Sequence, residues 1–243
     1  MGARHSDAYG AGMSRRRLLV VVAGAVVLGG ALVAAMALTT SGSSKKSAPP
    51  VGSQRVAAML RGVPQEGTAL GSPQAPVTLV EFADPQCPYC GDWARVALPV
   101  LVRRYVRTGS VRIVFSGMHF VGPDSETALR TALSAAAQKR FWNVLELLYE
   151  NQGTENTGWV TGSLLRSIGN AVPGLNTQQM LDGQNSAQVD RLLSEADALA
   201  QQAGVNSTPT FAVGKTGSTL RIVHVSSLGA TGLEPAIDAA LKS

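Results

Sequence analysis

The chemistry available to this sequence is concentrated in one tetrapeptide, Cys87-Pro88-Tyr89-Cys90, which holds the only two cysteines of the 243-residue chain. A disulfide between them closes a very small ring and therefore adds little to fold stability. Two thiols at this spacing are better suited to switching between oxidised and reduced forms. At the first turn of a helix, Cys87 would feel the positive end of the helix dipole, which favours the reactive thiolate.

A zinc site and an inert structural disulfide are the alternative interpretations of this spacing. Structural zinc usually requires four ligands. The chain has no second cysteine pair, and its only histidines are His5, His119 and His224. We therefore expect no metal and no other cofactor, and we interpret the pair as redox-active.

The residues on either side of the cysteines predict the elements that position them. Residues 77–82 are rich in residues with a high β preference, which predicts a central strand. An amphipathic helix is expected over 87–108. Pro99 should kink this helix, because proline lacks a backbone N–H, and Gly109 should end it.

Glu81 is the one charged residue of the predicted strand, where it would share a face with Val77 and Leu79. Two interpretations stay open at this point. The face could be partly solvated, as expected for an unpaired charge. Alternatively, Glu81 could be a buried carboxylate beneath the second cysteine, with a raised pKa that lets it carry protons during thiol exchange.

The order of the remaining elements indicates an α/β domain over residues 54–243 with a helical insertion at about 123–203. Asp124 or Ser125 is expected to cap the first inserted helix. The other elements that the pattern predicts are a strand at 111–115, a β-hairpin formed by 210–213 and 220–225, and a helix at 233–241.

The N-terminal part of the chain predicts a membrane anchor. Residues 18–38 carry no charge over 21 positions, which is long enough to cross a bilayer as a helix. Three arginines at 15–17 precede this run, so residues 1–17 should be a cytoplasmic tail. The polar residues 39–53 should be a flexible linker. The domain would then lie outside the cytoplasm, where a thiol oxidant is useful.

A cleaved export signal is the alternative interpretation of the same segment. Residues 35–37 offer a small-x-small cleavage pattern, and residues 14–19 resemble a twin-arginine signal. We favour a retained single-pass anchor because the apolar run is longer than a usual signal peptide core.

The basic charge of the chain, +5, belongs to its first 50 residues. Residues 51–243 hold 15 basic and 15 acidic side chains and are neutral. The neutral part contains no basic patch interleaved with aromatic residues, so we expect no nucleic-acid binding.

Four segments together resemble the DsbA-like branch of the thioredoxin superfamily, in particular membrane-anchored bacterial thiol–disulfide oxidoreductases. The resemblance covers about residues 64–241 and implies a thioredoxin-like fold. The segments are the strand and active-site signature at 80–90, the helical insert at 141–152, the Thr-Pro segment at 204–211 and the lead-in at 67–77.

The resemblance also implies roles at matching positions. Cys87 would be the exposed, attacking cysteine and Cys90 the buried, resolving one. Glu81 would be the family's buried acid, and Pro209 would be a cis proline beside the disulfide. The substrate-binding residues would be Pro88, Tyr89 and Thr208. Of these, Thr208 would pair through its backbone with a substrate strand.

Tyr89 departs from the strongest oxidants of this branch, where a histidine often stands. Because tyrosine carries no positive charge, we expect the helix N-terminus to be the main cause of a lowered Cys87 pKa. The redox direction is left open by this difference.

We expect a donor of disulfides to unfolded or reduced exported proteins. The resemblance implies reoxidation by a quinone-linked membrane thiol oxidase of the DsbB or vitamin K epoxide reductase-like type. An extracytoplasmic reductase or isomerase of the same fold is the alternative enzyme. A chaperone-like binding module using a groove at Pro209 is the non-enzymatic alternative.

Overall fold

The computed structural model describes residues 48–225 and 227–243, and Ala48–Ser243 forms one compact unit. The predicted cytoplasmic tail 1–17, the predicted membrane segment 18–38 and most of the expected linker 39–53 lie outside the described residues. Within the described part, none of the helices combines the length and apolar character needed to span a bilayer.

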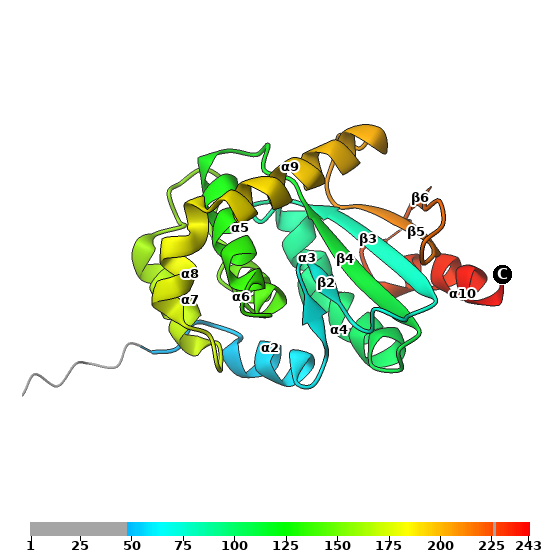
Figure 1. The fold of residues 1–243 in the computed structure, drawn as a ribbon, viewed down its shortest axis with the longest axis horizontal. Coiled ribbons are helices and arrows are strands. Elements are labelled where there is room, and N and C mark those ends of the chain that lie inside the picture. The colour runs from blue at the N-terminus through cyan, green and yellow to red at the C-terminus, as the bar shows by residue number, and fades with distance from the viewer. Residues whose placement is uncertain (1–47, 226) are drawn as a thin grey trace, which may run out of the picture. The chain divides into compact units, whose positions relative to one another are not determined.

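A single mixed sheet forms the centre of the unit, in the order β1-β2-β4-β3-β5-β6 (Figure 1). β3 and β4 run parallel, and the other neighbouring strands run antiparallel. β3 lies between β4 and β5, and all seven of its residues are buried. The strands are β1 Gln65–Glu66, β2 Ala69–Leu70, β3 Val77–Ala83, β4 Val111–Gly117, β5 Thr210–Lys215 and β6 Arg221–Val223.

The predicted helical insertion is confirmed: α5 to α9 follow β4, and α5 to α8 gather to one side of the sheet in Figure 1. The α-helices are α2 Ser53–Leu60, α3 Pro88–Val96, α4 Leu98–Leu101, α5 Pro123–Ala136, α6 Phe141–Glu150, α7 Gly162–Ala171, α8 Thr177–Asp182, α9 Ala187–Gln202 and α10 Glu234–Lys242. A π-helical turn, η1, spans Val102–Val106, and short 3₁₀ turns occur at η2 Gly183–Asn185 and η3 Ala230–Gly232.

The two faces of β3 belong to two different apolar clusters, because successive side chains of a strand point to opposite faces. Val77 and Leu79 join the main core together with both cysteines and the helices α3, α4, α6 and α10. Val80 and Phe82 join a smaller cluster that includes Ala200 of α9. By this alternation Glu81 points toward the main core, on the same face as the cysteines.

The single kinked helix predicted over 87–108 is three pieces. α3 ends at Val96, α4 begins at Leu98, and the π-helical turn η1 follows. Pro99 cannot donate to the carbonyl of Arg95, four residues earlier. That carbonyl instead accepts a hydrogen bond from Arg55 Nη1 at 3.2 Å. The kink therefore provides an attachment point for α2.

The predicted cap of α5 is wrong. The helix begins at Pro123, and Gly122 at its N-cap makes no side-chain capping bond. Asp124 accepts from the backbone of Gly158 and Trp159, at 2.9 and 3.1 Å. Ser125 is fully buried and donates to Asp84. Both side chains make tertiary contacts, which local capping rules do not anticipate.

Candidate active site

The two cysteines lie where β3 passes into α3. Cys87 is the N-cap of α3 and Cys90 lies in its first turn. Both are free thiols in this structure. Cys87 is 6% exposed and Cys90 is 0% exposed. We expected an exposed attacking cysteine. Cys87 is the more accessible of the two cysteines, but it is largely buried.

The environment separates the acidities of the two thiols. A hydrogen bond from the Cys90 thiol is the main cause that lowers the pKa of Cys87 to about 6, against the opposing effect of burial. Thr208 lowers the Cys87 pKa further, and the backbone N–H groups of Cys90 and Tyr89 contribute less. The expectation that the helix N-terminus would be the main cause is therefore wrong.

Cys90 has the opposite character. Burial raises the pKa of the Cys90 thiol well above its ordinary value, and its interaction with Cys87 raises it further. The pair thus holds one thiolate and one thiol near neutral pH. Because the thiolate is the nucleophilic form, Cys87 is the sulfur suited to attack and to leave.

The segment around Pro209 lies against the active-site sulfur, although 121 positions separate Thr208 from Cys87 in the chain. The Cys87 thiol lies 3.5 Å from the Thr208 carbonyl oxygen, and the Thr208–Pro209 peptide bond is cis. Thr208 and Pro209 are half-buried, whereas Pro88 and Tyr89 are exposed. All four residues predicted to meet substrate are therefore at least partly accessible.

A groove of about 320 Å³ runs beside this proline toward the edge strand β6. Its lining includes Pro209, Ile222 and His224, together with residues 203–207 between α9 and β5. An edge strand has unpaired backbone N–H and C=O groups, so an extended peptide can align there.

Glu81 is 1% exposed and faces the core, which removes the interpretation of a partly solvated strand face. Its Oε1 atom is buried and has no hydrogen-bond partner among the described residues. Burial raises the pKa of Glu81 well above its ordinary value, and the charges of Glu146 and Cys87 raise it further. A neutral, proton-bearing Glu81 therefore lies near the sulfurs.

Asp84, which the sequence did not single out, joins the active-site loop to the helical insertion. Its Oδ1 accepts from the Gln86 N–H at 2.8 Å and from the Ser125 hydroxyl at 2.6 Å. Its Oδ2 accepts from the Val121 N–H at 3.2 Å. Burial raises the Asp84 pKa, and these hydrogen bonds oppose that rise.

The side chains of Gln86 and Gln152 continue this attachment. Gln86 Nε2 donates to Ser125 and Asn156, and its Oε1 accepts from the Asn156 N–H at 2.8 Å. Gln152 Nε2 donates to the carbonyls of Pro85 and Cys87, at 2.9 and 3.0 Å. The loop before Cys87 is therefore held by the insertion. In the sequence, Gln86 was marked only by its position next to Cys87, and Gln152 only by its place in the segment 141–152 that resembles the helical insert.

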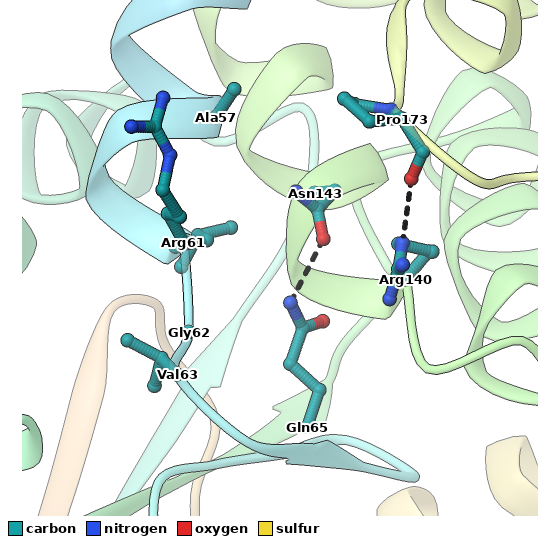
Figure 2. A pocket seen from close by; sticks show the side chains of 9 residues that line it. Ala57, Arg61, Gly62, Val63, Gln65, Arg140, Asn143 and Pro173 are labelled. Carbon is teal, nitrogen blue, oxygen red and sulfur yellow. Dashed lines mark hydrogen bonds between the residues drawn. The ribbon is translucent and has the colours of Figure 1, made fainter.

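Among the described residues, neither cysteine belongs to the lining of the Pro209 groove or of a second cavity further away. This second cavity measures about 420 Å³. Figure 2 shows two of its lining residues, Arg61 just after α2 and Arg140 just before α6. Gln65 donates to Asn143 across its floor at 2.8 Å. None of the predicted site residues lines this pocket. Over residues 48–225 and 227–243, no group of three or more His, Cys, Asp or Glu side chains is arranged to hold a metal ion.

Comparison with known proteins places this geometry in context. The thioredoxin family model matches residues 64–220. A Bacillus cereus protein named probable disulfide bond formation protein D is 31% identical over 148 residues, which are 60% of this chain and 68% of the relative.

Two solved structures are similar over most of their length. BdbD from Bacillus subtilis, in its oxidised form, has a TM-score of 0.63 at 22% identity and covers 74% of this chain and 98% of its own. A thioredoxin-like oxidoreductase from Silicibacter pomeroyi has a TM-score of 0.57 at 29% identity, with 77% and 98% covered.

Proposed function

The chain belongs to the thioredoxin family as a disulfide oxidoreductase of the DsbA-like type, and we propose that it donates the Cys87–Cys90 disulfide to reduced exported proteins outside the cytoplasm. The observation that carries this direction is the opposed acidity of the two thiols. Stabilising the Cys87 thiolate, with a pKa of about 6, stabilises the reduced pair and makes the disulfide more oxidising.

The reaction begins when a substrate thiolate attacks Cys87 Sγ. The Cys87–Cys90 bond breaks, a mixed disulfide forms at Cys87, and Cys90 leaves as a thiolate. Since burial raises the pKa of Cys90, this thiolate takes up a proton, for which the protonated Glu81 is the nearby source. A second substrate thiolate then attacks the substrate sulfur of the mixed disulfide, and Cys87 leaves as a stable thiolate. Two electrons pass from substrate to enzyme.

The groove at Pro209 is proposed to hold the substrate in extended form, with the Thr208 backbone pairing with it. Pro88 and Tyr89 would contact the same chain from the α3 side, since both are exposed next to Cys87. Regeneration requires a two-electron acceptor for the reduced pair. We propose a quinone-linked membrane thiol oxidase of the DsbB or vitamin K epoxide reductase-like type, reached through an anchor at residues 18–38.

Equilibration with glutathione buffers tests the direction. We expect a reduction potential above the ~−270 mV of a thioredoxin and below the ~−120 mV of the strongest oxidants, because the Cys87 pKa of about 6 lies between the ~7 of thioredoxin and the ~3.5 of DsbA. A thioredoxin-like value would contradict disulfide donation and favour the alternative enzyme, a reductase or isomerase.

Oxidation of a two-cysteine peptide, followed by mass, tests the mechanism. Cys87→Ser should lose all activity, whereas Cys90→Ser should accumulate a mixed disulfide at Cys87. Peptide binding and refolding activity that persist in Cys87→Ser without oxidation in the wild type would favour a chaperone-like module.

Location is tested separately on the full chain. Intact mass of the membrane-extracted protein distinguishes a retained anchor from cleavage at residues 35–37. Protease added to intact cells should digest the domain if it lies outside the cytoplasm.

A further inference from the structure

Glu81 has no direct route to solvent, although the proposed reaction requires it to exchange a proton in every cycle. Its side chain is 1% exposed, and one carboxylate oxygen is buried without a hydrogen-bond partner among the described residues. After Glu81 gives its proton to Cys90, it must regain one before the next cycle. A second polar group is therefore needed between Glu81 and the surface.

Glu146 on α6 has the properties of such a group. It is 3% exposed, and its Oε1 is also buried without a hydrogen-bond partner within the described part of the chain. A buried carboxyl group without partners is costly, so a purely structural role is poorly served by it. Glu146 is close enough to Glu81 for its negative charge to raise the Glu81 pKa.

The other side of Glu146 opens on a small cavity next to the protein surface. The cavity measures about 10 Å³, and its lining includes Glu146, Glu150 and Arg55. This is about the least volume that holds one water molecule, and three polar side chains border it. Arg55 forms an ion pair with Glu150, and its side chain is 46% exposed. The ion pair therefore connects the cavity with solvent.

We propose that Glu146 relays protons between Glu81 and the solvent at the Arg55–Glu150 ion pair. Glu146 exchanges its proton with Glu81 and does not contact the sulfurs, so it is a positioning residue and not a catalytic one. The inference rests on the proposed thiol–disulfide exchange and adds to it the path of the proton.

The relay balances over one cycle. When the Cys87–Cys90 bond opens, Glu81 gives a proton to the Cys90 thiolate and becomes a carboxylate. Glu146 then gives its proton to Glu81 and regains one from solvent through the cavity. When the pair is reoxidised, Cys90 loses its proton, which passes through Glu81 and Glu146 in the opposite direction. No electron passes through either carboxyl group.

The surroundings of Glu146 suit this role because burial and the neighbouring arginines have opposite effects on its pKa. Burial raises the pKa of Glu146 to about 8, while Arg55 of α2 and Arg95 of α3 lower it. Glu81 faces it from β3, and Glu150 and Tyr149 belong to its own helix. A group whose pKa lies near neutral pH can both accept and give a proton there.

The pH profile of thiol exchange tests the relay. The readout is the rate at which dithiothreitol reduces the Cys87–Cys90 disulfide of the full chain, between pH 5 and 9. Glu146→Gln should slow this step about tenfold near pH 7 and remove the limb of the profile near pH 8. The effect should be smaller than the ~10²–10⁴-fold of a direct acid or base, because Glu81 remains. Glu146→Asp should restore part of the rate.

A matched control is Glu234→Gln on α10, where the carboxylate pairs with Arg104 at 2.9 Å. It should leave the profile unchanged. If Glu146→Gln gives the wild-type rate and profile, the relay is wrong even though the enzyme is active. If the wild type fails to oxidise the peptide, the proposed function fails first, and the dithiothreitol assay still reports on the relay.

Loss of folding must be separated from loss of the relay. The absorbance of the Cys87 thiolate gives the pKa of that sulfur in each variant. An unchanged Cys87 titration with a changed rate profile supports the relay, whereas a shifted Cys87 titration in Glu146→Gln indicates a structural effect and contradicts it. Arg55→Gln removes a charge that lowers the Glu146 pKa, so it should move the high-pH limb of the profile to higher pH.

Discussion

Two buried carboxyl groups, Glu81 within β3 and Asp84 just after that strand, are three positions apart in the chain and differ in their hydrogen bonds. Asp84 accepts three hydrogen bonds from the loop and the helical insertion. Glu81 retains an oxygen without any partner among the described residues. Hydrogen bonds hold a carboxylate in place, whereas their absence leaves the proton as the way to remove its charge.

This difference in hydrogen bonding indicates a structural role for Asp84 and a role in proton transfer for Glu81. Asp84 joins a reactive loop to the helices that hold it, and Glu81 remains free to change its protonation. The following variants break or sharpen this contrast, in order of decreasing effect.

Glu81→Gln should slow thiol exchange by about 10²-fold near neutral pH, at the lower end of the range for a lost general acid. The neutral amide has the same shape, so the fold should persist. Stopped-flow reduction of the disulfide measures the rate. A wild-type rate in this variant would remove Glu81 from the chemistry. Glu66→Gln, at an exposed position of the edge strand β1, is the control.

Asp84→Ala should destabilise the domain by about 3 kcal/mol, because it leaves buried donors without their acceptor at about 1–3 kcal/mol each. Denaturant unfolding measures the change. Asp92→Ala, which removes an exposed carboxylate paired with Arg95, should cost less than about 1 kcal/mol. Equal losses in the two variants would show that the Asp84 attachment contributes nothing special.

The reduced protein should gain stability from Cys87 as pH rises. The folded pKa, about 6, lies below the ordinary value of 9.0, so this contribution is absent well below pH 6, grows above it and is complete above pH 9. Between pH 6 and 8 it amounts to about 2 kcal/mol. Comparing unfolding of reduced wild type and reduced Cys87→Ser across this range isolates it. A pH-independent difference would contradict the lowered pKa.

Ser125→Ala should have the smallest effect, about 1 kcal/mol, since Asp84 keeps two of its three hydrogen bonds. The exchange rate should stay within about twofold of wild type. Ser194→Ala, on the exposed face of α9, is the control and should be neutral. A rate change larger than that of Glu81→Gln would invert the contrast between the two carboxylates.

Local patterns predicted the parts of the site that are neighbours in the chain. The strand at 77–82, the cysteine pair and the helix after it follow one another, and short-range preferences suffice to place them. The same reasoning failed for Ser125, whose hydroxyl was assigned to a helix cap. It bonds Asp84, 41 positions away, and a local rule contains no information on that pairing.

The sequence by itself determined the reactive group, the strand and helix on either side of it, and that Glu81 shares a strand face with Val77 and Leu79. Only the tertiary structure decided that Cys90 and Thr208 lower the pKa of Cys87, that Asp84 is hydrogen-bonded, and that Glu146 raises the pKa of Glu81. The physical reason is that the sequence specifies the type of each side chain, whereas the pKa of that side chain depends on burial and on charges within a few ångströms. Those neighbours come from distant segments that meet only when the core forms.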